Sequence, residues 1–433
     1  MNWRRLFPII FIFSCFDGFI VNLFYPAKLP FLYKDILILI VYIIFFISRE
    51  PNKRWVFEFK TSVGSGTWYL AMLLMFLGLV QIFNPGVTNP LVGVLGFKTM
   101  FFYWPLAILA YAYVDDLDCL ERFMKTIVYI SIPICIFGIY QFWKGPDFLV
   151  KVFGQGFARG LFTAGAGVYG GKSFLRVPGT FASTGQFTSF LVVSSMFTLG
   201  LLFTARNQLT KLVMIGSLVL TYITMLCTGS RGGAIMLFAT TLILVILCRW
   251  LWRGLFIILL LGISFNFGFS YLGQGVYGRM KTVTDLSMIR GRTVDVASGM
   301  LGIYLQKYPF GRGMGTASLA GRHLSLNTSL DLELIENYVT KLQCELGIFG
   351  LAIFYLLLLN LLVRWNTHNW LKSIDRRHYI FVAVLTAYCW ARFCASFFDL
   401  IDAPPAAIFL WAELGIVARL ATFQSDDKYP LST

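Results

Sequence analysis

Eight cationic side chains lie in one segment, Gly273 to Leu342, which separates two long apolar runs. They are Arg279, Lys281, Arg290, Arg292, Lys307, Arg312, Arg322 and Lys341. The charge pattern of the whole chain puts this segment on the outer side of a membrane, where loops are usually poor in Lys and Arg. Guanidinium and ammonium groups pair with phosphate oxygens through charge-assisted hydrogen bonds. The segment therefore predicts an anionic substrate held at the membrane surface.

A further arginine, Arg231, stands in a short glycine-rich turn with the sequence TGSRGG, from Thr228 to Gly233. Apolar runs flank this turn on both sides, so its arginine cannot retreat far from the membrane surface. Glycines let backbone amides approach a phosphate closely. The alternative is structural, with Arg231 extending to the headgroups and capping two helices.

The long segment is predicted to hold two helices. Apolar residues recur at helical spacing from Val294 to Tyr308 and stop at Pro309, and Gly311, Gly313 and Gly315 follow. This pattern predicts an amphipathic helix at the membrane interface, closed by a glycine turn. A second helix is predicted from near Leu332 into the next apolar run. One of its faces is apolar, and the other carries polar side chains that we expect at the mouth of the membrane: Glu333, Glu336, Asn337, Thr340 and Lys341.

Composition decides the broad class of the chain. Of its 433 residues 58% are hydrophobic and 13% are charged, and the mean hydropathy is +0.72. Soluble globular domains are about 45 to 50% apolar, so the chain is predicted to be a polytopic membrane protein. The net charge of +15 lies mostly in short turns between apolar runs, which excludes nucleic acid as the natural partner and favours anionic lipid. The cysteines form no CxxC spacing, and three histidines offer no metal-binding pattern, so neither a disulfide framework nor a metal site is expected.

About twelve apolar runs approach the length of a membrane span. They are Leu6 to Phe24, Leu32 to Ser48, Thr67 to Phe83, Thr99 to Val114, Met124 to Trp143, Phe187 to Ala205, Leu212 to Thr228, Ala234 to Cys248, Leu255 to Leu272, Cys344 to Val363, Tyr379 to Phe397 and Pro404 to Leu420. With both termini in the cytoplasm, the short cytoplasmic loops collect most of the remaining cations, as the positive-inside rule requires.

We therefore expect an all-α polytopic membrane protein with about twelve transmembrane helices. A single membrane domain covers 1–433, with an outer loop domain at 273–342 and a cytoplasmic tail at 421–433. A second outer loop, Lys144 to Gln186, is rich in glycine, which suits either a flexible lid or a backbone that approaches a ligand.

Several motifs occur in a fixed order between Arg176 and Phe354. They are RVPGTFASTGQF, TGSRGG at the opening of a span, GRTVDVASGMLGIYLQKYPFGRGMG, and IENYVTKLQCELGIFGLAIF. Each motif is loose, but the series resembles the bacterial O-antigen ligase and O-antigen polymerase superfamily. The resemblance implies a glycosyltransferase at the periplasmic face of the bacterial inner membrane, with an undecaprenyl-diphosphate-linked glycan as donor. It also implies that Arg231 and a loop arginine, Arg292 or Arg290, hold the diphosphate.

One departure from the family pattern bears on the reaction. Ligases usually carry a His-Asn pair where this chain has Glu336 and Asn337. Glutamate there resembles the repeat-unit polymerases, so we expect a polymerase that joins lipid-linked repeat units of O-antigen, capsule or exopolysaccharide. Glu336 would then accept the proton of the attacking sugar hydroxyl. Two alternatives are an ordinary ion pair of Glu336 with Lys341 or with an arginine of the loop, and a replacement of the missing histidine by His323.

Other candidates for substrate contacts are Arg279, Arg312, Asn337, Lys98 and Arg176, of which Lys98 and Arg176 could instead extend to the headgroups. Buried charge at membrane depth is costly, so Arg392 is expected to pair with Asp399 or Asp402. Because arginines can supply the charge of a divalent ion, the transfer is expected to need no metal or other cofactor. Attack on the anomeric carbon in one step is expected to invert its configuration.

Two other functions stay open at the level of sequence. An O-antigen ligase or protein O-oligosaccharyltransferase would use the same donor with another acceptor. A multispan solute or polysaccharide transporter belongs to a different class, and it would typically be built from two related halves. Whether a flippase or a chain-length regulator associates with the chain is left open.

Overall fold

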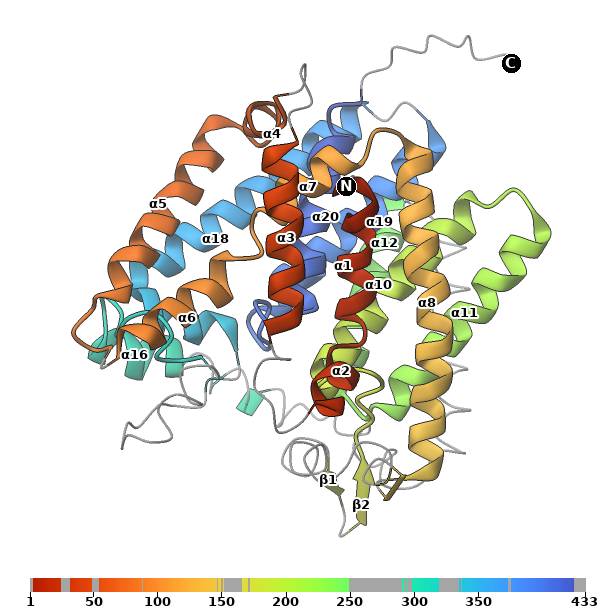
Figure 1. Ribbon diagram of the computed structural model, residues 1–433, viewed down its shortest axis with the longest axis horizontal. Coiled ribbons are helices and arrows are strands. Elements are labelled where there is room, and N and C mark those ends of the chain that lie inside the picture. Colours follow the sequence, from red (N-terminus) through yellow and green to blue (C-terminus); the bar gives the residue numbers. More distant parts are fainter. Residues whose placement is uncertain are drawn as a thin grey trace.

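The computed structural model describes most of the chain. The described residues are 3–24, 32–48, 54–87, 89–145, 147–148, 151, 166–169, 172–248, 290–291, 294, 298–318, 335, 337–372 and 375–423. Within these ranges the regular structure is almost entirely helical (Figure 1).

The helices and strands follow one another along the chain as α1 (Trp3–Ser14), α2 (Asp17–Leu23), α3 (Tyr33–Ile47), α4 (Trp55–Val63), α5 (Ser65–Ile82), α6 (Pro90–Phe101), α7 (Leu106–Tyr113), α8 (Leu117–Lys144), β1 (Ala166–Tyr169), β2 (Lys172–Leu175), α10 (Thr184–Thr204), α11 (Gln208–Cys227), α12 (Arg231–Cys248), the π-helical turn η3 (Ser298–Ile303), α16 (Tyr304–Lys307), α18 (Tyr338–Lys372), α19 (Arg376–Ala395) and α20 (Ala406–Leu420).

Seven helical segments in the described residues are long and apolar enough to cross a membrane. They are Ser65–Ile82, Pro90–Tyr113, Leu117–Lys144, Thr184–Thr204, Gln208–Cys227, Tyr338–Arg364 and Arg376–Ala395. The chain is thus a helical membrane protein. These segments coincide with the third to seventh, tenth and eleventh predicted spans, and the shorter apolar helix α12 coincides with the eighth.

The remaining predicted spans are less regular. The first, Leu6 to Phe24, consists of two short helices, α1 and α2. Helices α3 and α20, of 15 residues each, fall within the second and twelfth. The ninth, Leu255 to Leu272, lies outside the described residues.

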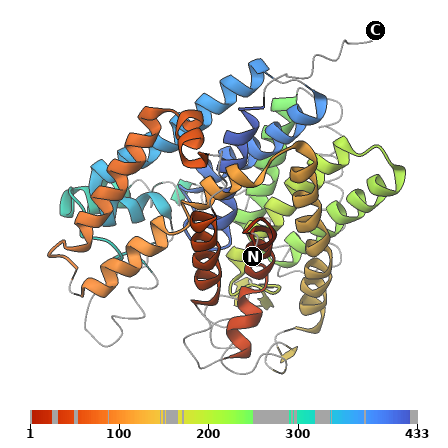
Figure 2. The ribbon, with the colours of Figure 1, turned by 45° about the horizontal axis from the view of Figure 1, so that its top comes forward.

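The two ends of the helix bundle differ in what they carry. Helices α2 and α16 and the β1–β2 hairpin lie at the lower end in Figure 1, which we call the hairpin end. Helix α4 lies at the opposite end, which we call the α4 end, and Figure 2 shows the same separation from a second direction. The hairpin is antiparallel and pairs Ala166 with Leu175, so the all-helical expectation needs this one amendment.

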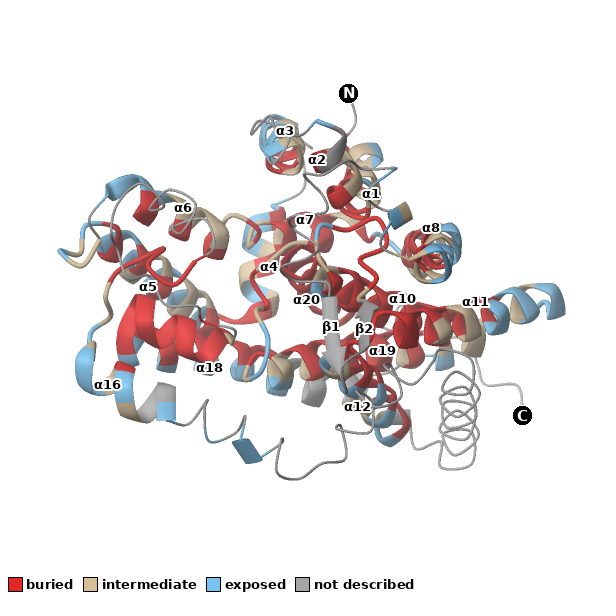
Figure 3. Ribbon diagram, turned by 90° about the horizontal axis from the view of Figure 1, so that it is seen from below, coloured by how far each residue is buried: buried red, intermediate tan, exposed pale blue. Residues whose placement is uncertain are grey.

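The centre of the bundle is α10. Of its apolar window 83% is buried, against 28% for α5. Figure 3, seen from the hairpin end, shows α10 covered by neighbouring helices while α3, α5 and α11 keep exposed faces. Large apolar side chains on those faces stay exposed, such as Phe76 at 64% and Leu212 at 66%. Such exposure would be costly in water, and it is expected of helices that face lipid.

Local sequence accounts for where the helices begin. The side chains of Asp116, Ser183 and Asn207 accept hydrogen bonds from backbone amides in the first turns of α8, α10 and α11. Asn89 does the same for α6, whose first residue is Pro90. These residues satisfy amides that have no partner inside the helix, and proline suits the first helical position.

The predicted glycine turn is confirmed, and its purpose is close packing. The helix α16 ends at Lys307 before Pro309, and Gly311, Gly313 and Gly315 all have positive φ. The turn crosses a kink in α18 at Gly347, where φ is 70° and a Cβ atom would lie 2.4 Å from the carbonyl carbon of Phe310. Only glycine permits this crossing.

Candidate functional site

Arg231 is the first residue of α12. The start of α12 packs on the start of α10, which directly follows the β1–β2 hairpin, so Arg231 lies at the hairpin end. The turn before it is held by Ser230, whose hydroxyl accepts a hydrogen bond from Gly233 N at 3.2 Å. Gly233 lies so close to α10 that a Cβ atom would be 2.8 Å from Cβ of Thr188. Arg231 is half-buried and stands where the amide dipoles of α12 add positive potential. The predicted turn is present but shorter than predicted, because Arg231 to Gly233 already belong to α12. Its close packing brings the start of α12 beside the start of α10.

A second arginine, Arg392 of α19, reaches the same region from inside the bundle. Its side chain is 0% exposed, and Nη1 donates to Ser189 Oγ at 3.3 Å, one residue beyond Thr188. Nη1 also lies 3.8 Å from Asp399 Oδ2, so the predicted pairing of Arg392 with Asp399 is confirmed. In the described part of the chain Nε and Nη2 of Arg392 have no hydrogen-bond partner. A buried guanidinium with unused donors is costly in a structure, and it is suited to an anionic ligand.

Asp399 connects Arg392 to the start of α18. Its backbone carbonyl accepts from Tyr338 N at 3.2 Å, and its side chain is 53% exposed. Loss of solvent around the carboxyl raises the pKa of Asp399, and the guanidinium of Arg392 acts in the opposite direction. A carboxylate at this position is therefore open to solvent on one side and paired with a buried cation on the other.

Asn337 begins α18 and has a capping role. Its side-chain oxygen accepts a hydrogen bond from Thr340 N at 2.8 Å, which satisfies an amide of the first turn. The residue is half-buried. Because the oxygen is occupied, a contact from Asn337 to a sugar would come from its amide nitrogen.

Two residues of the polar face predicted for the start of α18, Thr340 and Lys341, are buried rather than open at the membrane mouth, and for them the prediction is wrong. Glu333 and Glu336 of the same face lie outside the described residues. Lys341 forms an ion pair with Asp402, and their side chains are 5% and 6% exposed. Glu345, one helical turn further, is 1% exposed and accepts a hydrogen bond from Ala317 N at 3.2 Å. The glycine turn covers this face of α18, so its charges pair inside the protein. We call Lys341, Asp402 and Glu345 the buried charge triad.

Arg312 lies in the glycine turn, next to the triad. Its backbone amide donates to Cys344 O at 2.6 Å, and its guanidinium carbon lies 5.6 Å from the centre of the Tyr308 ring. The turn thus ties Arg312 to α16 and α18 at the hairpin end.

Three other predicted residues have separate surroundings. The carbonyl of Arg176 accepts from Thr184 Oγ1 at 2.9 Å, which places Arg176 at the start of α10, near Arg231. Lys98 forms an ion pair with Asp35 of α3, which gives it a structural partner away from the arginines. Arg290 is exposed. Glu336, Arg292, Arg279 and His323 lie outside the described residues.

The contacts above form a continuous chain across the hairpin end. Gly233, two residues after Arg231 in α12, adjoins Thr188 of α10. Ser189 adjoins Arg392 of α19, Arg392 pairs with Asp399, and Asp399 adjoins the first residue of α18. We call Arg231, Ser189, Arg392, Asp399 and Asn337 the arginine cluster. It brings together helix ends that are far apart in sequence, with Arg392 and Ser189 buried inside the bundle.

Sequence reasoning missed two buried carboxylates, Glu345 and Glu413. Glu413 of α20 is 1% exposed, and both of its carboxylate oxygens have no hydrogen-bond partner in the part of the chain that the structure describes. Arg392 is the cation that acts on it electrostatically. The signal in the sequence was a lone glutamate inside an apolar run, since ionisable residues within spans are rare and usually functional. Across the described residues no three His, Cys, Asp or Glu side chains are grouped as a metal site.

Comparison with known proteins gave no match to any protein-family model or to any curated protein.

Proposed function

We propose that this protein polymerises undecaprenyl-diphosphate-linked oligosaccharide repeat units at the periplasmic face of the bacterial inner membrane. A hydroxyl at the non-reducing end of the incoming unit attacks the anomeric carbon of the donor glycan. The bond from that carbon to the diphosphate oxygen breaks, and undecaprenyl diphosphate leaves with the electron pair. Glu336 takes the hydroxyl proton, and the anomeric configuration inverts without a metal.

The observation that carries this proposal is the contact chain of the arginine cluster. It unites Arg231 with Arg392, and Asn337, the sequence neighbour of Glu336, lies at its other end. Guanidinium groups pair bidentately with phosphate oxygens and stabilise charge on a departing diphosphate. Arg392, with its unused N–H donors, is a second cation beside Arg231, which the sequence motif indicated. In this proposal Arg290 and Arg292 complete the diphosphate site from the loop 273–342.

The membrane topology belongs to the same proposal: about twelve spans, a periplasmic loop at 273–342 and both termini in the cytoplasm. Its support is the charge at the α4 end of the described helices. Cations cluster where α8, α11 and α19 begin, and they are Arg122, Lys125, Arg206, Lys211, Arg376 and Arg377. By the positive-inside rule the α4 end is cytoplasmic, so the arginine cluster at the opposite end faces the periplasm.

The test is a reconstituted reaction. Purified protein in proteoliposomes receives lipid-linked repeat units and no other acceptor, and the products are separated by size. A polymerase gives a ladder of chain lengths. Arg231→Ala should lower the rate about a hundredfold, as expected on removal of one group that stabilises a transition-state charge. Arg231→Lys should recover a part of it, because an ammonium keeps the charge and loses the bidentate geometry.

The matched control is Arg206→Ala. Arg206 is exposed at the α10–α11 turn, at the opposite end of the same helices, and its loss should leave the ladder unchanged. Product that forms only after a separate acceptor is added would identify a ligase and contradict the polymerase. A full ladder from Arg231→Ala would refute the role of the arginine cluster.

A further inference from the structure

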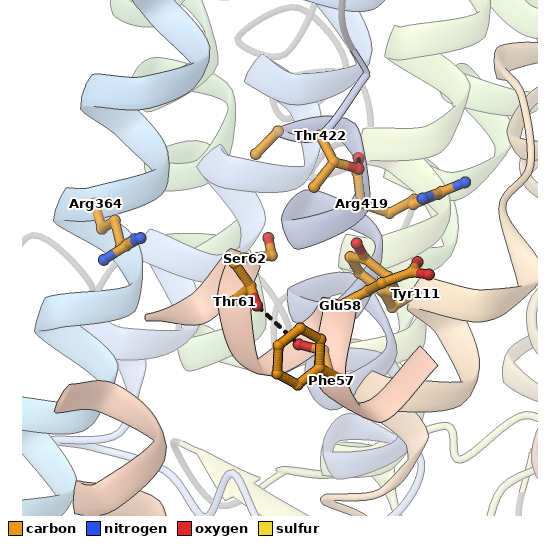
Figure 4. A pocket seen from close by; sticks show the side chains of 9 residues that line it. Phe57, Glu58, Thr61, Ser62, Tyr111, Arg364, Arg419 and Thr422 are labelled. Atoms are coloured by element: carbon orange, nitrogen blue, oxygen red, sulfur yellow. Dashed lines mark hydrogen bonds between the residues drawn. The ribbon is translucent and has the colours of Figure 1, made fainter. Parts of the chain in front are cut away.

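A pocket lies at the α4 end of the bundle, across the membrane from the arginine cluster. Its volume is about 490 Å³, within the range of small-molecule sites, and α4, α7, α18 and α20 surround it (Figure 4). Its walls are Phe57, Glu58, Thr61, Ser62, Tyr111, Arg364, Arg419, Ala421 and Thr422. None of these residues takes part in the proposed transfer reaction.

The position of α4 indicates the depth of the pocket in the membrane. This short helix buries Trp55, Phe59 and Val63 against the bundle and leaves Phe57 63% exposed. It directly precedes the span α5. A short amphipathic helix at the start of a span lies at the level of the lipid headgroups. Exposed Phe57 at the rim of the pocket is then suited to contact acyl chains.

Two arginines are held in place at this pocket. Nε of Arg419 donates to Val114 O at 3.0 Å, and its guanidinium carbon lies 5.3 Å from the centre of the Tyr111 ring. Arg364 is exposed and packs on Gly64, where φ is 86° and a Cβ atom would lie 2.3 Å from Nη1. Side chains fixed before binding lose little entropy when a ligand arrives. Figure 4 shows the two arginines on opposite sides of the pocket, with Arg419 pointing away from Arg364. Exposed Arg364 is therefore the one suited to a phosphate group.

The carboxylate of Glu58 and the three aliphatic hydroxyls of the pocket act as acceptors. Glu58 forms no ion pair with any described residue. The hydroxyls of Thr61, Ser62 and Thr422 donate to Phe57 O, Ala418 O and Arg419 O, at 3.0, 2.8 and 2.7 Å. With their hydrogens used, these oxygens offer only lone pairs to a ligand. A carboxylate and hydroxyl lone pairs are suited to a group with several N–H donors.

We infer that the pocket binds the phosphoethanolamine headgroup of a membrane phospholipid. Arg364 holds its phosphodiester, and Glu58 with the hydroxyl oxygens, across the pocket from Arg364, accepts hydrogen bonds from its primary ammonium. The headgroup therefore needs both charges, which separates it from a phosphatidylglycerol headgroup without an amine. It also needs N–H donors, which a phosphocholine headgroup with the same charges does not have.

The test is native mass spectrometry of the full-length protein in detergent, titrated with phosphatidylethanolamine, phosphatidylglycerol or phosphatidylcholine of identical chains. Wild-type protein should bind phosphatidylethanolamine about tenfold more tightly than the other two, the effect of about one charge-assisted hydrogen bond. Glu58→Gln should remove that preference and leave phosphatidylglycerol binding unchanged. Arg364→Ala should weaken both phosphatidylethanolamine and phosphatidylglycerol about tenfold.

Exposed Arg206, at the same end of the bundle, provides the control variant Arg206→Ala, which should bind all three lipids as the wild type does. Thr61→Val changes an exposed position and is a second probe of the ammonium site if Glu58→Gln cannot be purified. It should lower the preference for phosphatidylethanolamine. Unchanged lipid binding in Arg364→Ala and in the ammonium-site variants would overturn the inference. So would equal affinity of the wild type for phosphatidylglycerol, or equal thermal protection by soluble phosphoethanolamine, which would indicate a free ligand.

Discussion

Breaking the ion pair of the buried charge triad should destabilise the protein in a defined order. Lys341 and Asp402 are 5% and 6% exposed, and Glu345 lies beside them at 1%. Removing one partner of a buried pair costs about 3 to 5 kcal/mol, because the other charge remains buried. Asp402→Asn leaves Lys341 facing Glu345, so we expect about 3 kcal/mol. Lys341→Met leaves two buried carboxylates without a cation, so we expect about 5 kcal/mol.

The double variant decides whether these losses come from the pair. Lys341→Met with Asp402→Asn removes both charges, so its cost should fall below the sum of the single costs by about 2 to 3 kcal/mol. The free energy of unfolding would be measured by denaturant titration of the purified protein in one detergent. The surface pair Lys125–Glu121, with side chains 34% and 25% exposed, is the control, and its coupling should be about 0.5 kcal/mol or less. Additive single costs in the triad, or the reverse order of the two variants, would refute the reasoning.

Three further predictions concern the glycine crossing, the second arginine and pH. Gly347→Ala should lower the free energy of unfolding by about 2 kcal/mol or more, because φ of Gly347 is positive and a Cβ atom would meet Phe310. The control is Gly216→Ala in α11, which has open space around its Cβ and should be neutral or stabilising. Arg392→Lys should lower ladder formation about tenfold or more in the reconstituted assay, and wild-type rates would contradict its role at the diphosphate. Because burial raises the pKa of Asp399 in the folded protein, the folded state keeps its proton to a higher pH than the unfolded chain does. Stability should therefore fall as pH rises from the unfolded to the folded pKa, and Asp399→Asn should abolish this slope in denaturation measured across pH.

The spans and turns could be predicted because their causes are local. An apolar run of sufficient length must be helical in lipid, where each backbone amide needs a partner inside its own segment. The seven long apolar helices and α12 follow from this requirement. Backbone preferences act locally in the same way. Helix α16 ends before Pro309 and the glycines that follow it, and α12 begins within TGSRGG. Arg231 could be singled out for the same reason, because its turn is readable from neighbouring residues.

The orientation of the polar face of α18 could not be predicted in this way. Helical periodicity put Thr340 and Lys341 on the polar face, but it does not say what covers that face. The glycine turn and the α19–α20 connection cover it, and the partner of Lys341 is 61 residues away in the chain. Lys98 and Asp35 are 63 residues apart and pair for the same kind of reason.

The sequence by itself determined that this is a helical membrane protein, where most of its helices lie, and which arginine stands in a tight turn. Only the tertiary structure decided which charges meet. Arg392 and Ser189, 203 residues apart, come together because α10 and α19 pack side by side in the centre of the bundle. Hydrophobicity and backbone preference act over a few residues and leave their pattern in the sequence. The pairing of buried charges depends on how whole helices pack, which no local pattern records.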